Sequence, residues 1–240
     1  MTGALKTPDQ EVEIPTSLIK IVTDVIAVAW QRLIQDYDNT DFCNFVEDEI
    51  TEKLYTIIGE MDDDPTEELR GLAKLQSPVR EGNIRNYNGD HIDKQPDLTW
   101  RPQKGLLGKV GNTTTAAIFV ECKPVDKTHP IGSTYCKKGL VRFINGDYAW
   151  RVNRAIMVGY VRNLSKLPGV LEYALDAPEM KKLLGYSGSI SSEKVTIEND
   201  GVWRTTHARK FRNLGNIQIE HLWLYTREPC ENTTGRGSSL

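Results

Sequence analysis

The sequence has few cysteines, and they lie far apart. The 240 residues contain four, with no CxxC pair among them: Cys43, Cys122, Cys136 and Cys230. This spacing favours neither a zinc knuckle nor a disulfide framework. We therefore expect reduced thiols, as in a cytosolic protein.

Long apolar runs are also missing. No uninterrupted run approaches the roughly 20 residues that a membrane-spanning helix needs, and the N-terminus lacks the basic-then-apolar layout of a secretory signal. No internal repeat is present. These absences predict a cytoplasmic protein with no membrane association.

The remaining composition is that of an ordinary globular protein. Hydrophobic residues make up 39% of the chain and charged residues 26%, which argues against wholesale disorder. A chain of this length can bury one large core, so we predict a single domain over residues 1–228 and a flexible tail over 229–240. Within the domain we expect helices over 16–75, a core over about 41–165, and C-terminal strands over 202–226.

The net charge of -3 conceals an uneven distribution. Residues 1–100 carry 9 basic and 21 acidic side chains, whereas residues 101–166 carry 12 basic and 3 acidic ones. A middle segment of net charge +9 indicates a surface that binds a polyanion. The alternative is that the acidic and basic parts neutralise each other across the fold.

Apolar periodicity and turn signals predict a mixed α/β sheet flanked by helices. A hairpin is expected around the turn dipeptide Asn88-Gly89, and residues 187–200 have the composition of a loop. Helices are predicted over 16–35, 41–58, 66–75, 148–159 and 179–184, and strands over 91–101, 116–123, 140–144, 202–209 and 217–226.

The strand predicted at 116–123 ends on two charged residues, Glu121 and Lys123. Both point to one face of the strand, while the Cys122 side chain points to the other and should tolerate a small apolar replacement. A second carboxylate, Asp97, follows Pro96 in the preceding arm of the hairpin. Carboxylates and main-chain carbonyls are hard oxygen ligands, which Mg²⁺ prefers.

We therefore predict a Mg²⁺ site, in which Mn²⁺ substitutes, with Asp97, Glu121 and the main-chain carbonyl of Cys122 as ligands. Lys123 would orient the attacking water or stabilise phosphoryl charge. The alternative for Glu121 and Lys123 is an ordinary ion pair at the end of a strand.

Pro96-Asp97 and Glu121-Cys122-Lys123 together resemble the PD-(D/E)XK superfamily of restriction-endonuclease-like nucleases. The predicted order of helix, hairpin, apolar strand, strand and helix is similar to the core of that superfamily. The resemblance implies that Asp97 and Glu121 bind the metal and that Lys123 is catalytic. It also implies a glutamate from the first core helix, for which Glu49 is the candidate and Glu47 and Glu52 are competitors.

Basic residues beyond the motif are candidates for contacts with nucleic-acid phosphates. The run after the motif, with Tyr135 and Tyr148, is similar to stand-alone nucleases of bacterial anti-phage systems, as is the pair His207 and Arg209. The alternatives are solvated basic side chains and, for a histidine in a strand, an ordinary hydrogen bond. The candidates are Lys137, Lys138, Arg142, Arg151, Arg154, His207 and Arg209.

The sequence thus predicts a metal-dependent endonuclease that hydrolyses DNA, an effector in prokaryotic anti-phage defence. Cutting both strands needs two sites, so we expect a homodimer or a subunit of a multi-protein defence complex. The alternatives are a catalytically silent nucleic-acid-binding module, or a scaffold subunit whose acidic N-terminal helices dock a larger ATPase.

Overall fold

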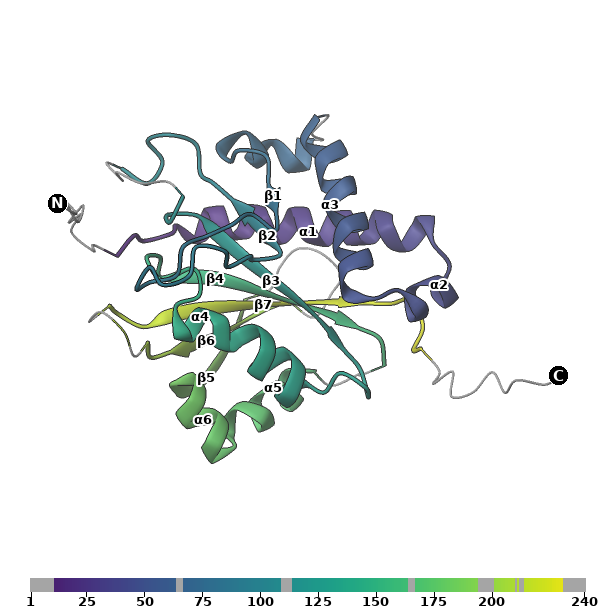
Figure 1. Cartoon of the computed structure of the whole chain (residues 1–240). Helices are drawn as coiled ribbons and strands as arrows, with labels where there is room; N and C mark the ends of the chain where they lie inside the picture. The colour runs from purple at the N-terminus through teal and green to yellow at the C-terminus, as the bar shows by residue number, and fades with distance from the viewer. Residues whose placement is uncertain are drawn as a thin grey trace.

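The computed structural model describes residues 11–63, 67–108, 114–163, 167–193, 201–209, 211 and 214–230. Over these residues the chain forms a seven-stranded mixed sheet with helices on both faces, as the mixed α/β prediction expects. The helices α1 and α3 lie on one side of the sheet, and α4, α5 and α6 lie on the other (Figure 1).

The strands are β1 (Val79–Arg80), β2 (Leu98–Trp100), β3 (Ile118–Val125), β4 (Arg154–Val161), β5 (Tyr186–Glu193), β6 (Val202–His207) and β7 (Ile217–Tyr225). The α-helices are α1 (Thr16–Asp36), α2 (Asn39–Asn44), α3 (Glu47–Asp63), α4 (Val141–Asn145), α5 (Leu167–Asp176) and α6 (Pro178–Leu184). A 3₁₀ helix, η1 (Glu67–Lys74), and a π-helix, η2 (Ile131–Leu140), complete the described elements.

The sheet has the strand order β1-β2-β3-β4-β7-β6-β5. Its centre is parallel, because β4 pairs in parallel with both β3 and β7, and its two outer parts are antiparallel. The crossover from β3 to β4 runs through η2 and α4, as a parallel connection requires. Every residue of β3 is buried, so this strand lies in the middle of the core.

Several predicted elements are confirmed. The structure has α1, β3, β6 and β7 close to the predicted positions, and α6 where a short helix is expected. The hairpin is present too: β1 pairs with β2, and Gly89 at its turn has φ of 81°, a left-handed conformation that glycine adopts readily.

The predicted strand at 140–144 and helix at 148–159 are both wrong. Residues 131–145 are helical, and Arg154–Val161 is strand β4. All but the first residue of β4 are buried, because a central parallel strand is covered on both faces. Its apolar run has no alternation, and a short continuous run does not distinguish a buried strand from a helix.

Two other segments differ from the predictions. The helix predicted at 41–58 is two helices, because Phe45 has an extended backbone that ends α2 before α3 begins. Residues 186–193, most of which were assigned to a loop, form the edge strand β5, whose polar composition fits its place at the margin of the sheet. The helix α5 was not predicted at all.

The prediction of four reduced thiols is wrong for two of the cysteines. Cys43 and Cys230 form a disulfide across 187 residues of sequence, while Cys122 and Cys136 are free and buried. This pair could not be predicted from the sequence, because two cysteines far apart in sequence give no local pattern. Cys230 is therefore held in place although we assigned it to the flexible tail, and residues 231–240 lie outside the described part of the chain.

Among the helices of the described residues, none has both the length and the apolar character needed to cross a membrane.

Candidate active site

The hairpin and β3 bring Asp97, Glu121 and Lys123 together, and we call these three residues the carboxylate–lysine cluster. Leu98 in β2 pairs with Val120 in β3, so Asp97 and Glu121 each lie one step beyond this pair on neighbouring strands. The main-chain N–H of Cys122 donates a hydrogen bond to Asp97 Oδ2 at 2.5 Å. This bond fixes the carboxylate against β3.

The Lys123 ammonium lies among oxygen atoms. Lys123 Nζ donates to the carbonyl oxygen of Cys122 at 2.7 Å and to Glu47 Oε1 at 2.5 Å. It lies 3.0 Å from Glu121 Oε1 and 3.8 Å from Asp97 Oδ2. The predicted ligands of the metal site therefore converge on one region, where the lysine supplies a positive charge.

Glu121 is fully buried and receives two further side chains. Tyr148 OH donates a hydrogen bond to Glu121 Oε2, and Arg142 Nη1 lies 2.9 Å from Glu121 Oε1. Oε1 also lies 3.0 Å from Lys123 Nζ, so this oxygen is held between an ammonium and a guanidinium. Two cationic side chains therefore compensate the buried charge of this carboxylate.

The electrostatics of the cluster follow from burial. Desolvation, together with the charge of Glu121, raises the pKa of Asp97 from 3.8 to about 7. Desolvation also raises the pKa of Glu121, against the opposing effect of Lys123 and Arg142. Burial lowers the pKa of Lys123, but the carboxylates of Glu121, Asp97 and Glu47 outweigh this, and the net pKa lies above its ordinary value. Lys123 is therefore an ammonium at neutral pH.

The helix glutamate that reaches the cluster is Glu47. The side chain of Glu49, our candidate, instead accepts a hydrogen bond from the main-chain N–H of Val46 at 3.0 Å, which caps the start of α3. Glu52 pairs with Arg80 in β1. The break between α2 and α3 decides the outcome, because it makes Glu47 the first residue of a new helix.

The residues fit a divalent cation in number and chemistry. No group of three or more His, Cys, Asp and Glu side chains in the described part of the chain is arranged to hold a metal. Mg²⁺, however, retains several waters and commonly binds to one or two protein carboxylates. Asp97, Glu121 and the Cys122 carbonyl supply such a set of oxygen ligands around the Lys123 ammonium.

A cavity of about 490 Å³ borders the cluster, and its wall is rich in cations. A second cavity, of about 240 Å³, also borders Arg142 and is lined by Asp93 to Gln95, Asp147 and Tyr148. The residues that line the larger cavity are Asn44, Phe45, Val46, Glu47, Lys123, Pro124, His129, Thr134, Lys138, Arg142 and Arg162.

Of the basic residues predicted to contact phosphate, Lys138 and Arg142 line the larger cavity. Lys137 is exposed beside them at the end of η2. Arg151 contacts the Thr115 hydroxyl at 3.3 Å, and Arg154 pairs with Glu220 at 3.3 Å within the sheet. The structure therefore brings two of these residues to the larger cavity, of which Arg142 also contacts Glu121, and gives Arg154 an internal partner.

His207 and Arg209 occupy structural positions rather than a phosphate-binding surface. His207 is fully buried and hydrogen-bonded to Thr205 and to the carbonyl of Leu184. Arg209 is 8% exposed, donates to the carbonyls of Gly215 and Val152, and pairs with Glu11. Phosphate contact by His207 is excluded by its burial in this structure.

Sequence reasoning missed Tyr148 and Arg142 as partners of Glu121, and it missed Arg162 and His129 in the cavity wall. No spacing rule connects them to the motif, because they come from α4 and from the loops that follow β3, α4 and β4. No such signal singles out Glu47 either, because the first turn of α3 also contains Asp48 and Glu49.

No protein-family model, no curated protein and no solved structure matches this chain.

Proposed function

We propose that the protein is a Mg²⁺-dependent nuclease that hydrolyses phosphodiester bonds in DNA. The observation that carries the proposal is the convergence of Asp97, Glu121, Lys123 and the Cys122 carbonyl beside a cavity lined by cations. Two acidic oxygens that each lie within 4 Å of one ammonium suit a metal-assisted hydrolysis of an anionic substrate.

Each residue has a separate task in this reaction. A bound divalent cation would neutralise the phosphate and lower the pKa of a water. Asp97 and Glu121 would hold it, and Arg142 and Tyr148 fix the Glu121 side chain. Lys123, whose raised pKa keeps it protonated, donates hydrogen bonds to the water or to a phosphoryl oxygen and is unsuited to act as a base.

We also propose that the fold is of the restriction-endonuclease-like type. The support is the placement of the motif: a hairpin with Asp97 beside β2, a buried β3 with Glu121 and Lys123, and a helix glutamate in contact with the lysine. The chain differs from the predicted order after β3, where a helical crossover comes before the next strand.

The proposal extends to the setting in which the nuclease acts. Cutting two DNA strands needs two sites, so we propose a homodimer or a subunit of an anti-phage defence complex in the cytoplasm. The Cys43–Cys230 disulfide is unusual for that compartment.

The test is cleavage of plasmid DNA by purified protein with Mg²⁺ or Mn²⁺. The variants Asp97→Asn, Glu121→Gln and Lys123→Ala should each lose activity by a factor on the order of 100 or more. Glu52→Gln is the matched control, because Glu52 pairs with Arg80 outside the cluster. Full activity in any of the three cluster variants would overturn the assignment.

One observation favours a second candidate, a catalytically silent nucleic-acid-binding module. Lys123 Nζ already neutralises the acidic oxygens, with Glu47, Glu121 and the Cys122 carbonyl as partners, so the cluster is stable as an ion-paired network. This candidate predicts DNA binding that weakens with salt and survives EDTA, with no turnover under any divalent ion.

A further inference from the structure

Next to the cluster, the larger cavity has a wall that the proposed cleavage reaction does not explain. We call it the Arg162 cavity, and the described part of its lining carries Lys123, Lys138, Arg142, Arg162 and His129 against a single carboxylate, Glu47. Lys123, Arg142 and Glu47 also belong to the active site or contact it, whereas Arg162, His129 and Lys138 do not touch the cluster. These three residues define a separate subsite.

Arg162 is a buried cation with incomplete compensation. It is 9% exposed, and its Nη2 donates to the carbonyl of Phe45 in the break between α2 and α3. Its Nη1 is 3.7 Å from Asp126 Oδ2, and its buried Nε has no hydrogen-bond partner among the described residues. Burial lowers the pKa of Arg162 despite the nearby carboxylate of Asp126. Such a group is stabilised by a further anion.

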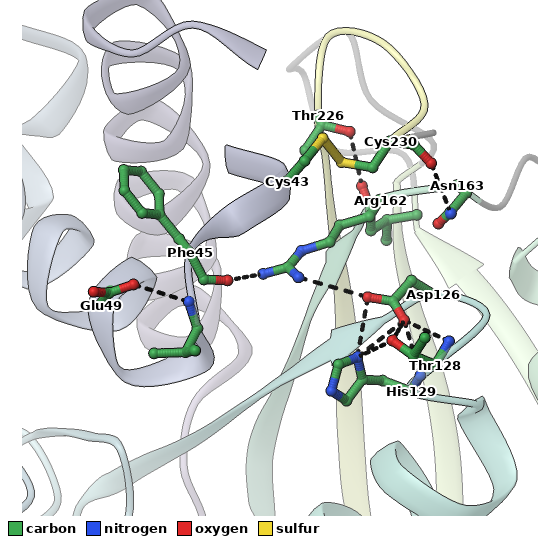
Figure 2. A network of polar contacts seen from close by, with 12 residues as sticks. Cys43, Phe45, Glu49, Asp126, Thr128, His129, Arg162, Asn163, Thr226 and Cys230 are labelled. Carbon is green, nitrogen blue, oxygen red and sulfur yellow. Dashed lines mark hydrogen bonds and ion pairs between the residues drawn. A yellow bond between two sulfur atoms is a disulfide. The ribbon is translucent and has the colours of Figure 1, made fainter. Parts of the chain in front are cut away.

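His129 is held at the cavity by Asp126. The Asp126 carboxylate accepts hydrogen bonds from the main-chain N–H groups of Thr128 and His129, each at 2.8 Å, and from the Thr128 hydroxyl. His129 Nδ1 lies 2.9 Å from Asp126 Oδ1 (Figure 2), so Nε2 is on the side of the ring away from Asp126. Asp126 thus orients both His129 and Arg162, which come from different segments of the chain.

We propose that the Arg162 cavity binds a phosphate group of the substrate strand next to the one that is cleaved, with Arg162, His129 and Lys138 as its contacts. This subsite rests on the proposed nuclease function. Phosphate fits better than a carboxylate, because it offers several oxygens to donors that approach from different sides. A volume of about 490 Å³ accommodates a group of nucleotide size.

The source of the phosphate is either the terminal monoester of a strand or an internal diester. The two sources are distinguished by comparing the binding of a 5′-phosphorylated thymidine dinucleotide with that of the same dinucleotide carrying a 5′-hydroxyl. If the phosphorylated one binds roughly tenfold more tightly to the wild type, the subsite takes a terminal phosphate. Equal affinities assign it to the internal diester.

The experiment measures dinucleotide binding by calorimetry in EDTA at low salt, so that it does not depend on cleavage. Lys138→Ala should weaken binding roughly five- to tenfold, and His129→Ala should do the same. Lys137→Ala is the matched control, since Lys137 is the adjacent exposed lysine and does not line the cavity. Its affinity should equal that of the wild type.

The subsite is overturned if Lys138→Ala and His129→Ala both bind as tightly as the wild type, or if Lys137→Ala weakens binding as much as Lys138→Ala. Lys138 is exposed, so its replacement leaves the fold intact and keeps the test informative. Failure of the nuclease proposal is distinguishable, because it appears as absent DNA cleavage with Mg²⁺ while dinucleotide binding in EDTA still depends on Lys138.

Discussion

Asp97 has a pKa of about 7 because its carboxylate is desolvated next to Glu121. For an acid, a pKa raised in the folded state means that the folded chain binds the proton more tightly than the unfolded chain does. Ionisation of Asp97 therefore costs stability as pH rises from about 4 to about 7. A divalent cation between Asp97 and Glu121 would remove this cost, which links metal binding directly to stability.

We predict that Mg²⁺ raises the melting temperature of the wild type at pH 8 and leaves that of Asp97→Asn unchanged. Without metal, the variant should be more stable than the wild type by about 1–3 kcal/mol, because a neutral amide replaces a desolvated carboxylate. Its amide oxygen can still accept from the N–H of Cys122. Thermal unfolding with and without Mg²⁺ checks both statements, and equal stabilisation of the two proteins by Mg²⁺ would contradict the metal site.

A chain of buried hydrogen bonds in the core determines the protonation state of two histidines, His207 and His221. Leu184 O can only accept, so His207 Nδ1 donates to it at 3.0 Å and His207 Nε2 accepts from the Thr205 hydroxyl at 2.7 Å. Thr205 in turn accepts from His221 Nε2, and His221 Nδ1 accepts from Tyr135 OH. Both histidines are therefore neutral. Burial lowers the pKa of His207 from 6.5 to about 4, and it also lowers the pKa of His221 well below its ordinary value.

This arrangement predicts a loss of stability in acid. The pKa of His207 is lower in the folded chain than in the unfolded chain. The stability that the neutral side chain contributes is therefore complete above pH 6.5 and is lost as pH falls toward 4. His207→Gln, which does not titrate, should be less stable at pH 7, but its free energy of unfolding should fall less between pH 7 and pH 4, by about 3 kcal/mol. Urea unfolding at both pH values measures this difference. An equal fall in the free energy of unfolding between pH 7 and pH 4 for the two proteins would refute the prediction.

At the scale of elements, two neighbouring glutamates at the start of α3 have different roles. Glu47 contacts the Lys123 ammonium, and Glu49 caps the helix through the N–H of Val46. Because the two side chains lie less than one helical turn apart, a pattern of helical spacing does not distinguish them. The extended residue Phe45, which breaks the predicted helix at 41–58, is what turns Glu47 toward β3.

We predict that Glu47→Gln lowers DNA cleavage by a factor of about 10 or more while leaving stability nearly unchanged, because it removes a charge that positions Lys123. Glu49→Ala should do the reverse: it should lower the free energy of unfolding by about 0.5–1 kcal/mol through loss of the cap and keep activity within about twofold. Cleavage rates and urea unfolding of both variants provide the check. Loss of activity in Glu49→Ala, with activity kept in Glu47→Gln, would show that Glu49 and not Glu47 positions Lys123.

The comparison between prediction and structure is most instructive at β3 and β4. The strand β3 was predictable because a short apolar run ends on charges, and the hairpin before it has a specific turn dipeptide. The strand β4 was not, because both of its faces are covered and its apolar run has no strand periodicity. The motif residues Asp97, Glu121 and Lys123 lie together as predicted, whereas Arg142 and Tyr148 reach Glu121 through tertiary packing alone.

At the scale of the whole molecule, the Cys43–Cys230 disulfide joins the end of α2 to the segment beyond β7. The same region is held by hydrogen bonds, since the N–H of Cys230 donates to the carbonyl of Arg162 at 2.7 Å and Asn163 Nδ2 donates to the carbonyl of Cys230 at 3.0 Å (Figure 2). Asn44 to Glu47, which follow Cys43, line the Arg162 cavity. The disulfide therefore restrains one wall of the proposed subsite.

We predict that reduction with dithiothreitol lowers the free energy of unfolding by about 2–4 kcal/mol, because the bond closes a long loop in the unfolded chain. The double variant Cys43→Ser/Cys230→Ser should show the lower stability at once and should not respond to the reductant. Cys136→Ser serves as the control, since it leaves the disulfide intact. A thiol count of four in the unreduced protein would contradict the pairing.

The measurement that tests the central claim most directly is diffraction from crystals soaked in Mn²⁺, with data collected at the manganese absorption edge. The account predicts an anomalous peak between Asp97 and Glu121, within coordination distance of the Cys122 carbonyl, and no such peak in Asp97→Asn crystals. A peak located elsewhere, or no peak in wild-type crystals at a Mn²⁺ concentration that supports cleavage, would contradict it.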